Sequence, residues 1–351
     1  MDILISLIIF FVVLSIIIII HELGHLIVAK KFGVYCSEFS IGMGPAIYQY
    51  KKSETTISIR AIPLGGYVQM AGEEGSDIEG IPFERTINGI KTWKQIVVMA
   101  AGATLNILLA FAIFIGVVMA RGYVSAPSDP IVGSIVENSP AATVGMMEGD
   151  RIVKMVLPDG EEIVPETFDD LVEGMSNYTG GSVIYTIERG SETLNFVVEP
   201  QYDETLQRYL VGFNSQPKVR TIAWYESFYY GAEMLFEMMG QIIQAFGNLI
   251  RGVGLQDVSG PIGIYQATSQ VASEGLNALI LWVGLLSLNV GIFNLFPIPI
   301  LDGGRIIIVI IEKIIGRRLS EKIQTAIMLV GLVLIVLLMV FATANDIGRL
   351  F

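Results

Sequence analysis

Residues 3–25 of the chain read ILISLIIFFVVLSIIIIIHELGH, an apolar run that ends in two histidines and a glutamate. On a helix, residues four apart share a face, so the imidazoles of His21 and His25 can converge on one ion. Glu22 lies beside that face, where a carboxylate can accept a proton from water. This is the H-E-x-x-H spacing of zinc sites, and the chain has no other histidine. The alternative is a chance match at a helix end. The cost of ionisable residues beside an intramembrane run, ~2.5–3.5 kcal/mol each at a helix centre, argues against it.

Composition places the chain in a lipid bilayer. Of its 351 residues, 52% are hydrophobic and 16% are charged, and the mean hydropathy is +0.62. These values are typical of a multi-span membrane protein. The net charge of −12 argues against a nucleic-acid partner. Cys36 is the only cysteine, so thiolates cannot supply the metal site.

Four apolar segments are long enough to cross a bilayer, at 3–29, 96–120, 278–300 and 326–342. Lysines and arginines follow the first segment as far as Lys94, and a second basic group runs from Arg305 to Lys322. Because basic loops face the cytoplasm, we expect the N-terminus outside. The histidine motif then lies towards the cytoplasmic end of the first span.

Residues 33–70 are predicted to form β-structure, because residues 55–60 alternate in character and glycines punctuate the stretch. We expect four short strands, near 34–41, 46–51, 55–62 and 66–70, followed by a polar loop at 72–92. An open sheet edge cannot face lipid, so it lies in a protein-lined cavity or at the interface. There it can accept a substrate as an added strand. A hairpin pair with only structural duties is the alternative.

Residues 122–203 are predicted to form a separate soluble domain. The order of strand, short helix, Gly-Asp turn, strand, helix and two strands resembles a bacterial PDZ domain. Most of the match lies in SPAA at 139–142 and GDRI at 149–152. One further crossing precedes the domain, so we expect it outside the cytoplasm.

Residues 204–275 are predicted to contain an amphipathic helix. Polar residues recur there at intervals of three, four and seven, which places them on one helical face. They are Glu226, Glu233, Glu237, Gln241, Gln244 and Asn248. This pattern alone fits either an interfacial helix or another span.

A tetrahedral zinc needs at least one protein ligand besides the two histidines. With no third histidine and no suitable cysteine, that ligand is an aspartate or a glutamate. Asp302 is the best candidate, because it follows an apolar span and Gly303 and Gly304 permit close backbone approach to a metal. A helix-capping aspartate is the alternative. Asp302 lies at the same membrane depth as His21 only if both spans run from outside to inside, and this requires a single crossing between them. The span at 96–120 supplies that crossing, so the helix at 223–251 should lie along the outer interface and not cross the membrane.

Asn106 interrupts the second span. It either faces the active-site cavity or hydrogen-bonds a neighbouring helix, and the sequence favours the second role.

Taken together, HELGH at 21–25, PLGGY at 63–67, the PDZ-like insert and NLFPIPILDGG at 294–304 resemble the bacterial site-2 proteases, in particular the regulator-of-sigma-E branch. The resemblance implies that His21, His25 and Asp302 bind Zn²⁺ and that Glu22 is the catalytic glutamate. It also implies that Asn294 contacts substrate near the scissile bond, although Asn294 could equally bond a neighbouring helix. The β-structure after the first helix would guide an unwound substrate.

The expected fold is an α-helical integral membrane protein with four transmembrane helices. A membrane-associated β-sheet follows the first helix, and an extracytoplasmic PDZ-like α+β domain is inserted. In order, the expected parts are the first transmembrane helix with HELGH (1–32), the cytoplasmic-side sheet and loop (33–94), the second transmembrane helix (95–121), the PDZ-like domain (122–203), the interfacial amphipathic helix region (204–275), the third transmembrane segment with LDGG (276–304), and a cytoplasmic loop with the fourth transmembrane helix (305–351).

The expected function is that of an intramembrane zinc metalloprotease in the bacterial cytoplasmic membrane, with its active site towards the cytoplasm. Its substrates would be single-pass transmembrane proteins already cleaved on the outer side, such as anti-sigma factors or signal-peptide remnants. The lipid bilayer is the other expected partner. A catalytically inactive membrane scaffold that binds peptides, or a metal transporter, is the alternative, and the sequence is silent on oligomeric state.

Overall fold

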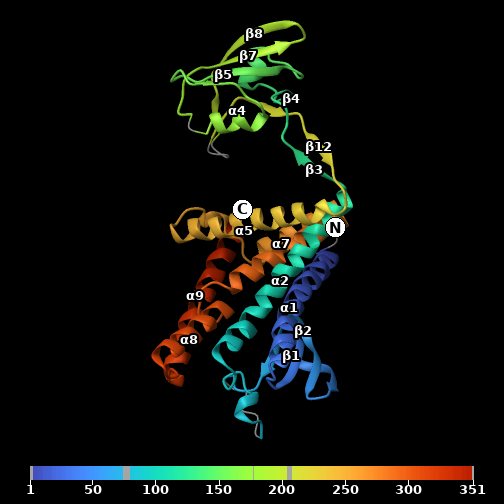
Figure 1. Cartoon of the computed structure of the whole chain (residues 1–351), viewed down its shortest axis with the longest axis vertical. Helices are drawn as coiled ribbons and strands as arrows, with labels where there is room; N and C mark the ends of the chain where they lie inside the picture. The colour runs from blue at the N-terminus through green and yellow to red at the C-terminus, as the bar shows by residue number, and fades with distance from the viewer. Residues whose placement is uncertain (1–2, 74–79, 177, 204–207, 350–351) are drawn as a thin grey trace. The chain divides into compact units, whose positions relative to one another are not determined.

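The computed structural model of the chain describes residues 3–73, 80–176, 178–203 and 208–349. The chain divides into two compact units (Figure 1). The first, which we call the helical unit, comprises Met1–Ala120 and Tyr225–Phe351. The second, the inserted unit, comprises Arg121–Trp224. Part of the polar loop predicted at 72–92 lies outside the described residues.

Seven helices build the described part of the helical unit. They are α1 (Ile3–Lys31), α2 (Thr92–Arg121), α5 (Glu226–Ile250), α6 (Pro261–Glu274), α7 (Leu276–Asn294), α8 (Asp302–Ile315) and α9 (Glu321–Gly348). In the described chain α1, α2, α7 and the Lys322–Gly348 part of α9 are long and apolar enough to cross a membrane. The prediction of four membrane-spanning helices is therefore confirmed at the level of length and composition.

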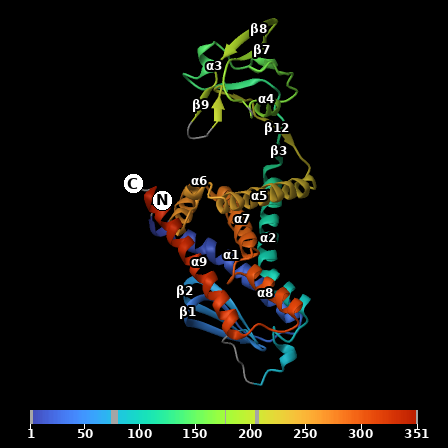
Figure 2. The same cartoon turned by 90° about the vertical axis from the view of Figure 1, so that its left-hand side faces the viewer.

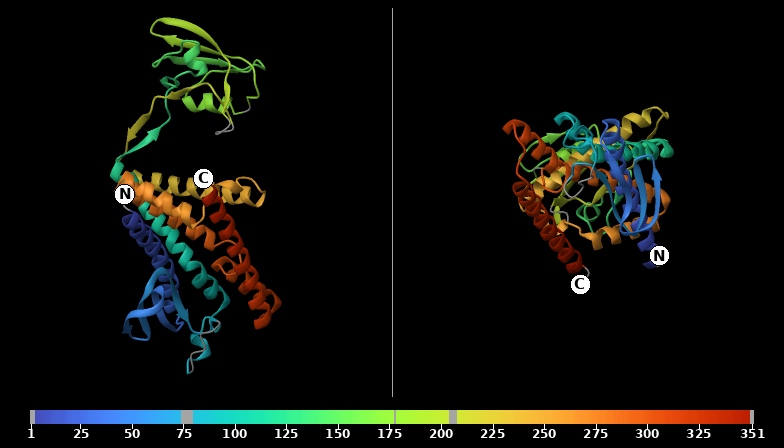
Figure 3. Two further views of the ribbon diagram at one scale, coloured as in Figure 1. Left: turned by 180° about the vertical axis from the view of Figure 1, so that it is seen from behind. Right: turned by 90° about the horizontal axis from the view of Figure 1, so that it is seen from below.

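Helix α5 lies crosswise to α1, α2 and α7, at the end of the unit where α1 begins and α9 ends (Figures 1 and 3). Its Leu235 packs with Phe114 of α2 and Leu288 of α7. Its other side exposes large aromatic residues, including Phe228 and Phe236. A helix that packs one side against other helices and exposes large aromatic residues on another side is typical of an interface.

The β-structure after α1 is one sheet of two long antiparallel strands, β1 (Cys36–Lys52) and β2 (Thr55–Met70), beside the C-terminal half of α1 (Figure 2). The predicted count of four short strands is wrong, because glycines bend the strands without ending them. Gly42 and Gly65 have φ of 87° and 84°, where only glycine is unstrained. Across these bends β1 has partners on both sides: Ile41 is paired with Gly66 and also with Ile59.

The sheet packs on α1 through one apolar cluster. Phe39 and Val68 of the sheet pack with Ala29 of α1 and Val98 of α2. A Cβ added to Gly66 would lie 2.8 Å from the Ser40 carbonyl oxygen and 3.6 Å from Cγ of Glu22. The segment Gly66–Met70 of β2 therefore runs directly beside the histidine motif.

The chain breaks between α7 and α8, as two prolines in the segment 295–301 require. Where the sequence predicts a loop from residue 305, the chain is helical, because α8 begins at Asp302 and continues to Ile315. The two glycines after Asp302 let α8 pack closely against the loop at this break. A Cβ on Gly303 would lie 2.5 Å from the carbonyl carbon of Leu295, and one on Gly304 would lie 2.7 Å from that of Ile298. These close contacts are with the loop that precedes α8, whereas the sequence predicts that the two glycines make room for a metal.

The inserted unit has a four-stranded sheet in the order β6-β5-β7-β8. Three strand pairs and two short helices accompany it. In chain order the elements are β3 (Tyr123–Ala126), β4 (Val132–Ile135), α3 (Pro140–Thr143), β5 (Arg151–Val156), β6 (Glu162–Ile163), α4 (Phe168–Gly174), β7 (Val183–Arg189), β8 (Glu192–Val198), β9 (Gln201–Asp203), β10 (Arg208–Leu210), β11 (Phe213–Ser215) and β12 (Lys218–Thr221).

This unit extends beyond the end predicted for it at residue 203. Strand β11 pairs with β4 and β12 pairs with β3, so the chain returns to where it entered. Such long-range pairing leaves no local signal, which is why the sequence placed the boundary too early. The core is built around Ile152, Met155 and Tyr185, with Met146 packed beside them.

A buried carboxylate in the inserted unit is paired with a partly exposed guanidinium. Asp150 is 1% exposed, and both its oxygens accept hydrogen bonds of 2.7 Å from the Arg189 guanidinium. The backbone N–H of Met147 donates a third bond, of 2.8 Å. Burial alone would raise the pKa of the Asp150 carboxyl, but these donors outweigh it and hold the pKa below its ordinary value.

We therefore predict that Asp150→Asn destabilises the inserted unit by roughly 2–3 kcal/mol at pH 7, since a buried ion pair loses one charge while the Met147 bond survives. The carboxylate contributes stability above the unfolded pKa of about 3.9, and that contribution is lost as pH falls through the lower folded pKa. The gap between variant and wild type should close below about pH 4. Hydrogen exchange of core amides in the full-length protein, corrected for intrinsic rates, measures it.

Asp129→Asn is the matched control, because Asp129 forms an ion pair with Lys218 in which both side chains are about half exposed. An exposed pair is worth at most about 1 kcal/mol. Equal effects of the two substitutions at pH 7 would contradict the role given to Asp150.

Candidate metal centre

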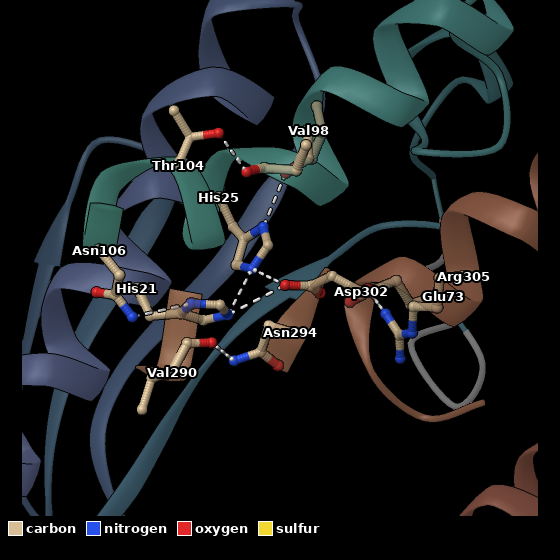
Figure 4. Close-up of polar contacts among 11 residues, drawn as sticks. His21, His25, Glu73, Val98, Thr104, Asn106, Val290, Asn294, Asp302 and Arg305 are labelled. Carbon is tan, nitrogen blue, oxygen red and sulfur yellow. Dashed lines mark hydrogen bonds and ion pairs between the residues drawn. The ribbon is translucent and has the colours of Figure 1, made fainter. Parts of the chain in front are cut away.

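Three predicted ligand side chains meet at one point (Figure 4). His21 and His25 come from successive turns of α1, and Asp302 is the first residue of α8. Oδ2 of Asp302 lies 3.1 Å from Nε2 of His21 and 3.4 Å from Nε2 of His25. The two Nε2 atoms are 3.2 Å apart. The side chains of His21, His25 and Asp302 are 10%, 8% and 16% exposed, so this polar cluster is largely buried.

These separations fit a zinc ion. Ligand atoms about 2.0–2.2 Å from zinc at tetrahedral angles lie about 3.3–3.6 Å from one another. The three observed separations are 3.1, 3.2 and 3.4 Å. Oδ2 of Asp302 is also buried without a hydrogen-bond partner in the described part of the chain. A buried carboxylate oxygen without a donor is costly, and a cation beside it removes that cost.

Helix α2 shapes the pocket behind the imidazoles. Nδ1 of His25 lies 2.8 Å from the Val98 carbonyl oxygen, so Nδ1 donates and Nε2 presents its lone pair to the centre. At Gly102 a Cβ would lie 2.8 Å from Nε2 of His21 and still closer to Nε2 of His25. At Gly24 a Cβ would lie 2.8 Å from the carbonyl carbon of Ala101. Glycine at both positions lets α1 and α2 approach closely enough for this contact.

Asn106 contacts one of the predicted metal ligands, a contact that its sequence context alone does not show. The hydrogen bond to a neighbouring helix that its sequence favours is present, because Nδ2 of Asn106 lies 3.4 Å from Nδ1 of His21 on α1. A signal was present in the spacing of Val98, Gly102 and Asn106, which are four residues apart and share one face of α2. Without the fold, nothing showed that this face meets the histidine motif.

Glu22 faces a cavity of about 530 Å³ that the three clustered side chains also line. Its carboxylate meets the backbone of Val68 in β2. Residues 67–70 of β2 form one wall of the cavity, which also holds Asn294. The cavity therefore combines a metal-ligand cluster, a carboxylate and a stretch of extended backbone.

Asn294 lies near Asp302, and its Nδ2 donates a 2.9 Å bond to the carbonyl of Val290 one turn earlier in α7. This bond is not the predicted alternative of a bond to a neighbouring helix, because Val290 lies on the same helix as Asn294. Arg305, one turn after Asp302, forms a 2.8 Å ion pair with Glu73, and both residues line the cavity. This pair links α8 to the chain that follows β2.

Comparisons with known proteins agree on one family. Residues 9–338 match the model of Peptidase family M50. A protein of Clostridium perfringens is 37% identical over 95% of this chain and 96% of its own length. The zinc metalloprotease RasP of Bacillus licheniformis is 29% identical over 97% of this chain and 98% of its own length. The regulator of sigma-W protease RasP of Bacillus subtilis is 28% identical, with the same coverage.

The Gly102 contact yields a prediction. Alanine favours helix more than glycine does, so Gly102→Ala should leave α2 intact while its methyl group displaces both imidazoles. We expect zinc affinity to fall at least about 10-fold, as when other supports of metal ligands are disturbed. Competition with a chromophoric chelator measures it.

Gly116→Ala is the control, because a Cβ at that position of α2 meets no described atom within 4 Å. Equal zinc affinity in the two variants would show that Gly102 does not set the position of the imidazoles.

Proposed function

The chain belongs to peptidase family M50 and is a zinc metalloprotease with four candidate membrane spans, and we propose that it cleaves peptide bonds inside the transmembrane segments of single-pass proteins. The observation that carries this proposal is the meeting of His21, His25 and Asp302 beside Glu22 in one cavity. The cavity is lined in part by residues of α1, α2 and α7, three of the candidate membrane spans, which supports a substrate that enters from lipid.

In this proposal His21, His25 and Asp302 hold the zinc ion. When bound there, zinc supplies a Lewis acid that lowers the pKa of water and polarises a carbonyl. Glu22 accepts a proton from the attacking water as the water oxygen bonds to the scissile carbonyl carbon. It then passes that proton to the leaving amine as the C–N bond breaks. The place of Glu22 next to His21 and on the same cavity wall supports this role.

The substrate would bind in extended form. A transmembrane helix hides its amides in its own hydrogen bonds, so it must unwind locally and find new partners. Tyr67, Val68 and Gln69 of β2 line the cavity, and in the described chain β2 pairs with no strand other than β1. They can therefore receive the unwound segment as an added strand. Asn294, whose nitrogen is held by Val290, would offer its amide oxygen to a substrate N–H near the scissile bond.

The proposed topology places the inserted unit outside the cytoplasm. Helix α1 starts at the end of the helical unit where α5 lies, and α9 finishes at that end (Figures 1 and 2). Lys30 and Lys31 close α1 at the opposite end. The positive-inside rule assigns that basic end to the cytoplasm. The metal centre then lies towards the cytoplasmic side of a bacterial cytoplasmic membrane, and α5 lies along the outer surface.

The inserted unit, which resembles a PDZ domain, would restrict access to substrates already shortened on the outer side. Its chain leaves α2 and returns to α5, so a folded domain is tethered at the proposed outer end by two closely spaced strands, β3 and β12. Such a domain can exclude bulky ectodomains or bind newly made C-termini.

We predict that Glu22→Gln abolishes cleavage of a transmembrane substrate while zinc binding stays within a few-fold of wild type. Loss of a general base lowers the rate by about 10²–10⁴-fold. Zinc content and cleavage in reconstituted vesicles are measured on the same preparations. Unchanged cleavage would remove Glu22 from the mechanism, and metal flux without proteolysis would favour a transporter.

The two roles of the inserted unit separate in a deletion. Removing residues 127–217 leaves β3 and β12 to be joined by a short turn, because they pair antiparallel. If the unit excludes ectodomains, the shortened enzyme should cut full-length substrates that wild type leaves intact. Size exclusion is wrong if full-length substrates stay uncut while pre-cleaved ones lose processing.

A further inference from the structure

A buried amide stands behind one of the two imidazoles. Asn106 is 0% exposed, and its Nδ2 lies 3.4 Å from Nδ1 of His21 (Figure 4). Its Oδ1 is buried and has no hydrogen-bond partner among the described residues. Leaving a buried amide oxygen unpaired costs roughly 1–3 kcal/mol. We therefore expect this oxygen to have a hydrogen-bond donor in another state of the site.

The tautomer of His21 identifies that partner. His21 turns Nε2 towards Asp302 and His25, so Nε2 is the atom that would ligate zinc. A neutral imidazole carries one hydrogen, and a ligating nitrogen must present its lone pair. With zinc bound, the hydrogen therefore sits on Nδ1, which becomes a donor. The group facing Nδ1 is the Asn106 amide, whose oxygen and nitrogen exchange places when the amide turns half a turn.

We propose that Asn106 is a positioning residue: in the zinc-loaded protein its Oδ1 accepts the Nδ1–H of His21 and so fixes the ligating tautomer and the ring orientation. This inference rests on the proposed zinc ligands. In the arrangement of Figure 4 the amide turns Nδ2 towards Nδ1 of His21, at 3.4 Å, and its Oδ1 has no hydrogen-bond partner among the described residues. The half-turn of the amide exchanges the two atoms, so that Oδ1 faces the Nδ1–H of the ligating tautomer.

Helix α2 then orients both imidazoles, by two different groups. His25 receives its partner from the backbone, as its Nδ1 donates to the Val98 carbonyl at 2.8 Å. The ring of His21, on α1, faces a later turn of α2 and receives its partner from the Asn106 side chain. Gly102 stands midway between them and leaves room for both rings. Fixing the second ring nitrogen of a metal-binding histidine is a general way to raise affinity.

The amide is held in place from the side of α7. The hydroxyl of Ser287 donates a 2.9 Å bond to the backbone carbonyl of Asn106. At Gly291 a Cβ would lie 3.0 Å from the Ala103 carbonyl oxygen and 3.4 Å from Cβ of Asn106. With Asn106 0% exposed, this close packing keeps water away from the amide, whose side-chain hydrogen bond among the described residues is to His21.

The direct test is ¹⁵N NMR of histidine-labelled full-length enzyme in micelles, purified through a tag without histidine. The chain has only two histidines, so the spectrum holds four imidazole nitrogens. With zinc we expect both rings to be protonated at Nδ1 and metal-shifted at Nε2, with the Nδ1–H of His21 protected from solvent exchange. A His21 ring unprotonated at Nδ1 would overturn the proposal. If neither ring responds to zinc, the proposed ligand set fails as well.

Zinc affinity of three variants gives an independent readout. Asn106→Leu removes the acceptor and should weaken zinc binding about 10- to 100-fold. Asn106→Asp keeps an acceptor oxygen and should stay within a few-fold of wild type. Asn289→Leu is the matched control, because Asn289 donates to Leu285 of its own helix. Wild-type affinity in Asn106→Leu, or equal loss in the leucine and aspartate variants, would overturn the proposal. If Asn106→Leu does not fold, the spectrum of wild type decides.

Discussion

Two imidazoles and one carboxylate, delivered by the first helix and by a helix near the end of the chain, have to stand about as far apart as the ligands of a single zinc ion. They do so in a pocket where the histidines are less than a tenth exposed. Buried charges and unpaired polar atoms are costly unless they are gathered around a compensating partner. The helical unit is therefore built to bring α1, α2 and α8 to one point and to keep water from surrounding them.

Small residues make this approach possible. Between apolar helices in lipid the hydrophobic effect gives little drive, so association depends on close packing and on a few hydrogen bonds. Gly24 brings α1 against the backbone of α2, and Gly291 does the same between α7 and α2. Gly303 lets α8 begin directly against the loop that ends α7, which carries Asp302 to the histidines. The same contacts that pack the helices thus set the distances within the site.

Much of this was predictable because the signals are local and chemically specific. The spacing of His21 and His25, the length of the apolar runs and the prolines before Asp302 each follow from sequence and elementary geometry. Asp302 was chosen because it follows an apolar span and precedes two glycines in a chain without a third histidine, and the structure places its carboxylate beside both imidazoles. The bent strands, the extension of the inserted unit to Trp224 and the helix α8 were not predicted. The first two depend on glycine conformations and long-range pairings that short sequence windows do not contain.

Asn106 shows a different limit. An asparagine in an apolar helix satisfies its amide equally well on a neighbouring backbone or on a functional side chain, and its sequence context is the same in both cases. Only the meeting of α2 with α1 shows that its partner is His21. The role of such residues has to be found from contacts.

The central claim is that one ion is shared by His21, His25 and Asp302, and X-ray absorption at the zinc edge of the full-length enzyme tests it most directly. The account predicts a first shell of nitrogen and oxygen at about 2.0–2.1 Å, with the outer-shell scattering of two imidazoles. In His25→Ala any zinc that remains should show a single imidazole. Sulfur in the first shell, or an unchanged spectrum in Asp302→Ala, would contradict it.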